Sequence, residues 1–193
     1  MNTMDAIAQR RSIRRFTDQP LECAEIKRIL EAAVLAPSGK NRQPWRFVVL
    51  TEAARTHLAD LIDRSCESIA AQGGDVGSAP GSARIIRTAP VTVVVFETEL
   101  PPPWKQFEEG ARIVDAQSIG AAIQNMCLAA TAEDLGSLWI ADVLYAEDAI
   151  TAWLGTSEER LIAAVSLGHP DEAPDARPRR PLEETVAWRS EAG

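Results

Sequence analysis

The chain has 193 residues, of which 46% are hydrophobic and 25% charged, a composition typical of a folded globular protein with a substantial core. Its formal net charge of −8 argues against partners that require a positive surface, so we expect no binding to nucleic acid and none to anionic membranes. We find no internal repeat and no compositional break, and predict a single domain over residues 1–193.

Cysteine and histidine usage narrows the chemistry further. Cys23, Cys66 and Cys127 form no CxxC pair and fit a reducing cytosol, where we expect each to be a small buried apolar residue. His57 and His169 have no partner at metal-ligand spacing, so no metal site is predicted. The N-terminus lacks the apolar core of a signal peptide, and we therefore expect a cytoplasmic protein.

Apolar periodicity predicts helices and strands that do not alternate strictly, which favours an α+β fold. Residues 3–11 form an amphipathic helix capped by Thr3, and the helix at 22–35 must end before Pro37. Residues 72–83 have the composition of a mobile loop, which either closes over a site or simply connects two elements. The further elements are a strand at 46–50, a helix at 52–71, a strand at 91–96, a helix at 107–133, a strand at 137–140, a helix at 147–154 and a strand at 161–167.

Two features suggest contacts beyond these elements. Small residues at Gly120–Ala122 allow the long helix to approach a neighbour closely, either inside the domain or, as we favour, across a dimer axis. From Gly168 onward the chain is rich in proline and arginine, which predicts an extended arm. The arm ends in Leu182, Val186 and Trp188, which are apolar enough to dock as another strand or clasp.

A dense group of arginines follows the first helix. Four of them lie within the six residues Arg10–Arg15, and apolar residues between them indicate that the segment packs down on the protein. A guanidinium group can bind two phosphate oxygens at once through two parallel N–H···O hydrogen bonds, and the hydroxyl of Ser12 adds a donor. Arg177 and Arg179 on the C-terminal arm could close the same anion site. The alternative is an ordinary solvated charged surface.

Residues 36–50 change character halfway along. Ala36–Pro44 is rich in proline, glycine, serine and amides, which build a fixed loop. Trp45–Leu50 then reads as a core strand. A rigid polar loop that leads into a buried strand can hold a flat polar ligand, although it can also be a simple connector.

The usual side-chain machinery of hydrolysis and phosphoryl transfer is missing. Ser12 and Ser38 have no histidine nearby in sequence, and the motifs GxSxG, GxxxxGK[ST] and GxGxxG do not occur. We therefore predict no catalytic side chain. If the chain is an enzyme, a cofactor carries the difficult chemistry.

The motif RRSxRxF at Arg10–Phe16, followed by APSxxNxQPWxF at Ala36–Phe47, resembles the nitroreductase family of FMN-dependent oxidoreductases. Further similarity extends from Asp115 to Arg179, so the resemblance covers essentially the whole chain. It implies an α+β fold with a central, mostly antiparallel sheet flanked by helices, in an intertwined homodimer. FMN would lie at the subunit interface of this dimer.

The resemblance also implies where FMN would bind. Its phosphate would be held by Arg10, Arg11, Ser12, Arg177 and Arg179. Arg14 would lie near the N1/O2 edge of the ring, where a positive charge stabilises the reduced flavin. The loop residues Pro37, Ser38, Gly39 and Asn41 would contact the flavin of the other subunit. The ring would be lined by Ile140, Ala141 and Asp142, with a backbone N–H near N5.

The implied reaction is a ping-pong transfer of hydride from NADH or NADPH through flavin N5 to an electron-poor small molecule, such as a nitroaromatic or quinone. Two alternatives stay open: other flavin chemistry on the same fold, such as reductive dehalogenation or flavin cleavage, and a flavin-binding protein without turnover. The sequence departs from the family pattern at Gly39, where many relatives have serine, and at Asp142-Val143, where some have Glu-Gly. Longer relatives also carry an asparagine and a lysine near the ring in the region after the second helix, and residues 72–88 have no clear equivalents, although Arg84 or Arg87 could substitute.

Overall fold

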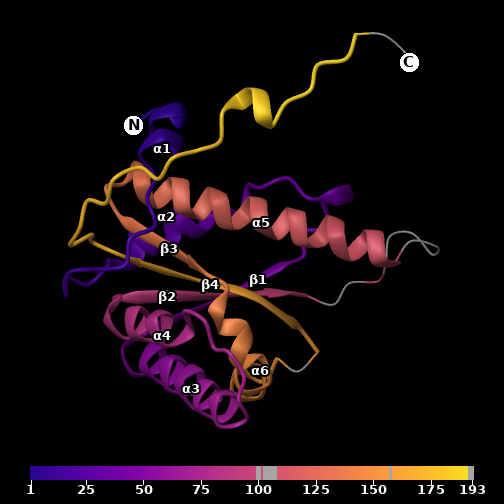
Figure 1. Ribbon diagram of the computed structural model, residues 1–193. Helices are drawn as coiled ribbons and strands as arrows, with labels where there is room; N and C mark the ends of the chain where they lie inside the picture. The colour runs from indigo at the N-terminus through magenta and orange to yellow at the C-terminus, as the bar shows by residue number, and fades with distance from the viewer. Residues whose placement is uncertain (99–100, 102–107, 157, 191–193) are drawn as a thin grey trace.

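An antiparallel sheet forms the centre of the computed structural model, which describes residues 1–98, 101, 108–156 and 158–190 (Figure 1). Within this part of the chain the strands lie in the order β1-β2-β4-β3, and every neighbouring pair is antiparallel. Each predicted strand is present close to its expected position, which confirms the predicted α+β class. The strands are β1 (Trp45–Thr51), β2 (Val91–Glu97), β3 (Gly136–Ile140) and β4 (Arg160–Gly168).

The two central strands are apolar on both faces because helices cover both sides of the sheet. Val91–Phe96 of β2 and Ala163–Gly168 of β4 are buried throughout. Thr92 and Ser166 are opposite partners in this ladder, and their hydroxyl oxygens lie 3.0 Å apart. The hydrogen bond between them satisfies both hydroxyls in a region that water does not reach.

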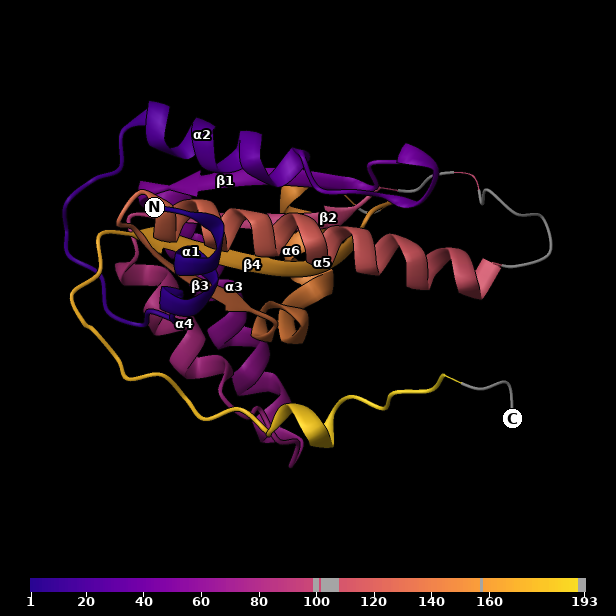
Figure 2. The ribbon, with the colours of Figure 1, turned by 90° about the horizontal axis from the view of Figure 1, so that it is seen from above.

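Helices form one layer on each face of the sheet (Figures 1 and 2). One layer contains α2 (Cys23–Val34) and α5 (Glu108–Ala132), and α1 (Thr3–Gln9) contacts α5. The other layer contains α3 (Glu52–Ala71), α4 (Ala79–Thr88), α6 (Glu147–Leu154) and the 3₁₀ helix η2 (Asp142–Ala146). Each layer buries its own aliphatic cluster against the sheet, with Ile119, Ile123 and Met126 on one side and Leu58, Ile62 and Ile86 on the other.

The long helix α5 confirms the prediction at 107–133, with residue 107 outside the described part of the chain. Its small-residue patch lies against β3, because a Cβ built at Gly120 would be 3.8 Å from the ring of Trp139. Trp139 is nevertheless 44% exposed, and Ile113 near the start of α5 is 52% exposed. None of the helices among the described residues is long and apolar enough to cross a bilayer.

The segment 72–83, predicted as a mobile loop, is a loop only in its first part. Helix α4 begins at Ala79, and Pro80 stands in its first turn, where the missing N–H has no helical partner to lose. Ala83 and Ile86 on this helix are fully buried. The prediction was wrong because burial of the α4 face outweighs a composition that is otherwise typical of a loop.

The chain termini also differ from the sequence prediction. Asn2, rather than Thr3, caps α1 with its side chain. The C-terminal arm is extended as predicted and contains a short 3₁₀ turn at Leu182–Glu184, and Trp188 beyond this turn is 89% exposed in the single chain (Figure 2). Cys23 was expected to be buried and is exposed at the start of α2. Within the described chain, the apolar end of the arm therefore lies open to solvent.

Candidate functional site

The arginine-rich segment after α1 is fixed against the start of β3. Ser12 and Ser137 form an isolated bridge, in which the N–H of Ile13 donates to the carbonyl of Ser137 at 3.0 Å. Ile13 and Phe16 are buried, as their apolar character predicted. Gly136 makes this approach possible, because a Cβ there would lie only 3.0 Å from the Ile13 side chain. The arginines on either side of Ile13 are therefore held on a rigid backbone.

A pocket of about 470 Å³ opens beside this segment, and the C-terminal arm forms its other wall. Glu172 fastens the arm, because its Oε1 accepts hydrogen bonds from the N–H groups of Arg14 at 2.5 Å and Arg15 at 3.2 Å. We call this cavity the arginine pocket. Its polar lining residues are Arg10, Arg11, Ser12, Arg14, Asp175, Arg177 and Arg179. The structure thus brings together all six residues that the sequence assigned to the phosphate and to the nearby ring edge.

Five arginines line this pocket with a single aspartate among the described lining residues. Their recorded hydrogen bonds go to backbone carbonyls: Arg11 Nη1 donates to Ala8 O at 2.8 Å, and Arg179 Nη1 donates to Arg177 O at 3.0 Å. Within the described residues, none of the five guanidinium groups forms an ion pair with a carboxylate. Their uncompensated positive charge suits a multiply charged anion such as a phosphate.

The segment predicted to follow the flavin ring lies at the end of β3. Ile140 is buried and Ala141 is exposed. The carboxylate of Asp142 faces α4, because its Oδ2 accepts hydrogen bonds from Ser78 Oγ at 2.7 Å and Ser82 Oγ at 2.6 Å. Asp142 thereby fixes the start of α4 beside this segment. This contact could not be predicted from a sequence in which residues 72–83 have the composition of a loop.

Arg84 and Arg87 are the two arginines that could substitute for the ring contacts of longer relatives. They differ in their surroundings in the structure. Nη2 of Arg87 donates to Oδ1 of Asp60 at 2.5 Å and to Oδ2 of Asp63 at 2.7 Å, which ties α4 to α3. Hydrogen bonds to these carboxylates raise the pKa of Arg87. Arg84 is exposed on the surface of α4. Arg87 therefore has a structural role between two helices.

The loop at Pro37–Gln43, which we call the 37–43 loop, has a strained backbone. Lys40, Asn41 and Gln43 have φ values of 52°, 55° and 50°. A residue other than glycine in this left-handed region costs roughly 1–2 kcal/mol. The loop is held in part by its own side chains, since Ser38 Oγ accepts a hydrogen bond from the N–H of Gln43 at 3.0 Å.

Helix α5 supports the 37–43 loop through the side chains of Asp115 and Val114. Arg42 Nε and Nη2 donate to the two oxygens of Asp115 at 3.0 and 2.9 Å, and this bond raises the pKa of Arg42. Gly39 lies so close to α5 that a Cβ there would be 2.4 Å from Val114 Cγ1. A side chain at this position would therefore require Val114 or the loop to move.

The 37–43 loop and the arginine-rich segment that follows α1 lie toward opposite ends of α5 (Figures 1 and 2). The loop contacts Val114. Helix α1, which ends directly before Arg10, packs against α5 on the part that lies away from the loop (Figures 1 and 2). None of the described residues of the 37–43 loop lines the arginine pocket, so the two predicted halves of the flavin site lie apart in the single chain.

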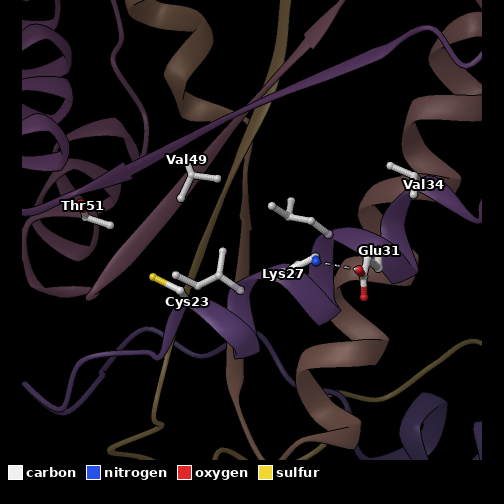
Figure 3. Close-up of a pocket in the computed structure, with 8 residues that line it drawn as sticks. Cys23, Lys27, Glu31, Val34, Val49 and Thr51 are labelled. Carbon is white, nitrogen blue, oxygen red and sulfur yellow. Dashed lines mark ion pairs between the residues drawn. The ribbon is translucent and has the colours of Figure 1, made fainter.

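A second pocket, of about 520 Å³, lies between α2 and the edge strand β1 (Figure 3). Its lining is mainly aliphatic, with Ile26, Leu30 and Val49 among the residues that form it. Lys27 Nζ and Glu31 Oε1 also line it, and they form an ion pair at 3.7 Å. Because this cation is neutralised locally, the pocket lacks the excess positive charge of the arginine pocket. The sequence analysis did not predict it.

Comparison with known proteins shows the family of this chain. The sequence profile of the Nitroreductase family matches residues 7–169. YfhC of Bacillus subtilis, provisionally named an NAD(P)H nitroreductase, is 30% identical over 189 residues, which cover 92% of this chain and 89% of YfhC.

Solved structures of similar length agree with this match. One is a provisionally named nitroreductase from Desulfovibrio desulfuricans in complex with FMN, with 30% identity, a TM-score of 0.75 and coverage of 100% of this chain and 99% of that one. Another is a BluB-like flavoprotein from Clostridium difficile 630, with 30% identity, a TM-score of 0.81 and coverage of 98% and 100%. The resemblance inferred from the sequence motifs is thus confirmed, and the chain belongs to the nitroreductase family.

Proposed function

We propose that this protein is an FMN-dependent oxidoreductase that works as a homodimer and takes electrons from NADH or NADPH. It would deliver them, in a ping-pong reaction, to a small electron-poor acceptor such as a nitroaromatic or a quinone. The observation that carries the proposal is the arginine pocket, with five arginines and no ion pair among its described residues. The FMN in the Desulfovibrio desulfuricans structure and the name of the Bacillus subtilis relative support the choice of cofactor and electron donor.

The residues of the arginine pocket fit the phosphate of FMN. A phosphate offers three acceptor oxygens, and guanidinium groups can bind them in pairs. Each such charge-assisted hydrogen bond is worth about 1.5–3 kcal/mol, so two or three of them hold the group firmly. We assign this role to Arg10, Arg11, Arg177 and Arg179, with Ser12 as an additional hydroxyl donor.

The remaining half of the site would come from a second copy of the chain. Pro37, Ser38, Gly39 and Asn41 lie apart from the arginine pocket in the single chain, so we assign them to the flavin of the neighbouring subunit. Exposed apolar side chains such as Trp139 offer a surface that a second copy could cover. On this account a monomer would not retain FMN.

When bound, FMN would supply the hydride chemistry itself, and no side chain need act as acid or base. The protein would then contribute binding and electrostatics. We propose that Arg14, which is exposed at the pocket, places positive charge at the N1/O2 edge of the ring, where negative charge develops on reduction. Ile140, Ala141 and Asp142 would lie along the ring with a backbone N–H near N5.

Spectroscopy of the purified protein tests the proposal. We expect a yellow dimer with one FMN per chain, which loses its colour when NADH or NADPH is added without oxygen. Turnover with a nitroaromatic or quinone should give parallel double-reciprocal plots, as a ping-pong reaction requires. A folded dimer that takes up no FMN would contradict the proposal.

The same preparation separates the alternatives. Product analysis under air and under nitrogen distinguishes reductive dehalogenation and flavin cleavage from simple electron transfer. A protein that binds FMN but shows no steady-state oxidation of NADH or NADPH with any acceptor would be a flavin store or sensor. The cytoplasmic location stays a prediction from the sequence.

A further inference from the structure

We propose that Asp115 on α5 is a positioning residue for the flavin site, and that it acts through Arg42 to hold the 37–43 loop in its binding conformation. The inference rests on the proposed function, because the position of this loop affects catalysis only if the loop contacts bound flavin. Asp115 itself would not touch the cofactor.

The 37–43 loop needs an external support. Lys40, Asn41 and Gln43 have positive φ values, and such a backbone persists only where its surroundings fix it. The loop precedes β1 and has few backbone hydrogen bonds of its own: Asn41 N–H donates to Ser38 O and Arg42 N–H to Gly39 O. Arg42 lies between two of the strained residues, so a constraint on its side chain acts where the strain is stored.

The bond between Arg42 and Asp115 has the geometry of a strong constraint. Both carboxylate oxygens are engaged, at 3.0 and 2.9 Å, and the two side chains are only 11% and 6% exposed. The third nitrogen, Nη1, donates to the carbonyl of Pro101 at 2.7 Å. One guanidinium group thus ties together the loop, α5 and the chain that follows β2. Its planar fork fixes direction as well as distance, which a lysine could not do.

Stability alone is a weak reason for such a pair. The desolvation of two buried charges offsets most of their attraction, and well-packed apolar residues often replace a buried pair without loss of stability. A polar pair at this place is better explained by the conformation that it selects. Val114, the neighbour of Asp115, also contacts Gly39, so two adjacent positions of α5 set the place of the loop.

The test compares flavin binding with folding in the FMN-loaded enzyme. The first variants are Asp115→Asn, which keeps shape but removes charge, and Arg42→Lys, which keeps charge but removes the fork. We expect each to weaken both FMN and riboflavin by about tenfold or more and by equal factors. Riboflavin lacks the phosphate, so an equal loss locates the defect at the ring or the ribityl chain and not at the phosphate. We also expect kcat to fall while the KM for NADH or NADPH changes little.

A double variant separates positioning from stability. Arg42→Met with Asp115→Leu should unfold at the wild-type temperature or above, because it buries no unpaired charge. It should nevertheless retain the flavin-binding defect of the single variants. The matched control is Glu133→Gln, which breaks another bidentate arginine–carboxylate pair, with Arg28, away from the loop. This control should bind both flavins as the wild type does.

The outcomes are distinct. Wild-type flavin affinity and kcat in Asp115→Asn or Arg42→Lys would overturn the positioning role and leave the proposed function intact. If the single variants fail to fold, the double variant decides: recovery of flavin affinity together with stability would show a structural role only. A wild-type protein that binds neither flavin would overturn the proposed function, and this inference with it.

Discussion

The arginine pocket and the 37–43 loop are both polar, but their arginines differ in their partners. In the pocket, five guanidinium groups line one cavity, and the hydrogen bonds of Arg11, Arg14 and Arg179 go to backbone carbonyls. In the loop, Arg42 is almost completely buried and bonded through both nitrogens of its fork to Asp115. Positive charge without a carboxylate partner indicates an anionic ligand, whereas a fully paired arginine indicates support of the backbone.

The two regions also owe their rigidity to different contacts. The arginine-rich segment is fixed by main-chain contact with β3 through Ser12 and Ser137. The 37–43 loop depends on side chains, above all Arg42 and Asp115. Single substitutions in the pocket should therefore weaken binding of the charged part of the ligand. Single substitutions at the loop contacts should instead change the backbone geometry of the loop.

The largest expected effect follows from removing charge in the pocket. Arg10→Ala combined with Arg177→Ala deletes two groups that we assign to the phosphate, and FMN affinity should fall by roughly 100-fold or more. Riboflavin affinity should stay nearly unchanged, because riboflavin has no phosphate. Fluorescence titration with both flavins measures this. Arg64→Ala, an exposed arginine on α3, is the control; equal losses for FMN and riboflavin in the double variant would refute the assignment.

An intermediate effect is expected from crowding the loop. Gly39→Ser places a Cβ 2.4 Å from Val114 Cγ1 and should destabilise the protein by about 1–3 kcal/mol, measured by urea unfolding. Val114→Ala in the same chain should restore much of this loss. Gly81→Ser is the matched control, because a Cβ at Gly81 meets nothing within 4 Å. Equal stability of the two serine variants would show that α5 does not confine the loop.

The smallest effect concerns a paired arginine outside both regions. A hydrogen bond from Arg28 lowers the pKa of Glu133 below its ordinary value of 4.5. The pair therefore stabilises the fold above that value, and this contribution is lost as the pH falls through the lowered pKa. The unfolding temperature should be measured from neutral pH down to a pH below 4.5, the ordinary pKa of a glutamate. Over this range it should fall less steeply in Glu133→Gln than in the wild type. Parallel curves would mean that the pair contributes nothing.

Much of the fold could be predicted because periodicity reports burial directly. The strands around Val91–Phe96 and Leu161–Leu167 are apolar runs interrupted only by Thr92 and Ser166, and the structure places them at the centre of the sheet. Helix α4 could not be predicted in the same way, because Pro80 and the glycines around it resemble a loop until the burial of Ile86 is known. Composition records which residues break a helix but not which of them stand in its first turn.

For the candidate site, the sequence indicated residue types and motifs but not their partners. The chemistry of Arg10 and Arg177 suggested a shared anion site, and the structure brings both to one pocket. Arg42 and Asp115 are far apart along the chain, so no local sequence pattern predicts that they pair. For the same reason the sequence could not show that the 37–43 loop lies apart from the arginine pocket in one chain.

The central claim is that each flavin site combines the arginine pocket of one chain with the 37–43 loop of another. Hybrid dimers test it most directly, when one chain carries Arg10→Ala with Arg177→Ala and the other carries Ser38→Ala with Asn41→Ala. If the halves combine between chains, one site of each hybrid is entirely wild type and the other carries both defects. We therefore predict one FMN per hybrid dimer, bound with wild-type affinity. If no site of wild-type affinity is found, although both parent variants fold and dimerise, the shared-site account is contradicted.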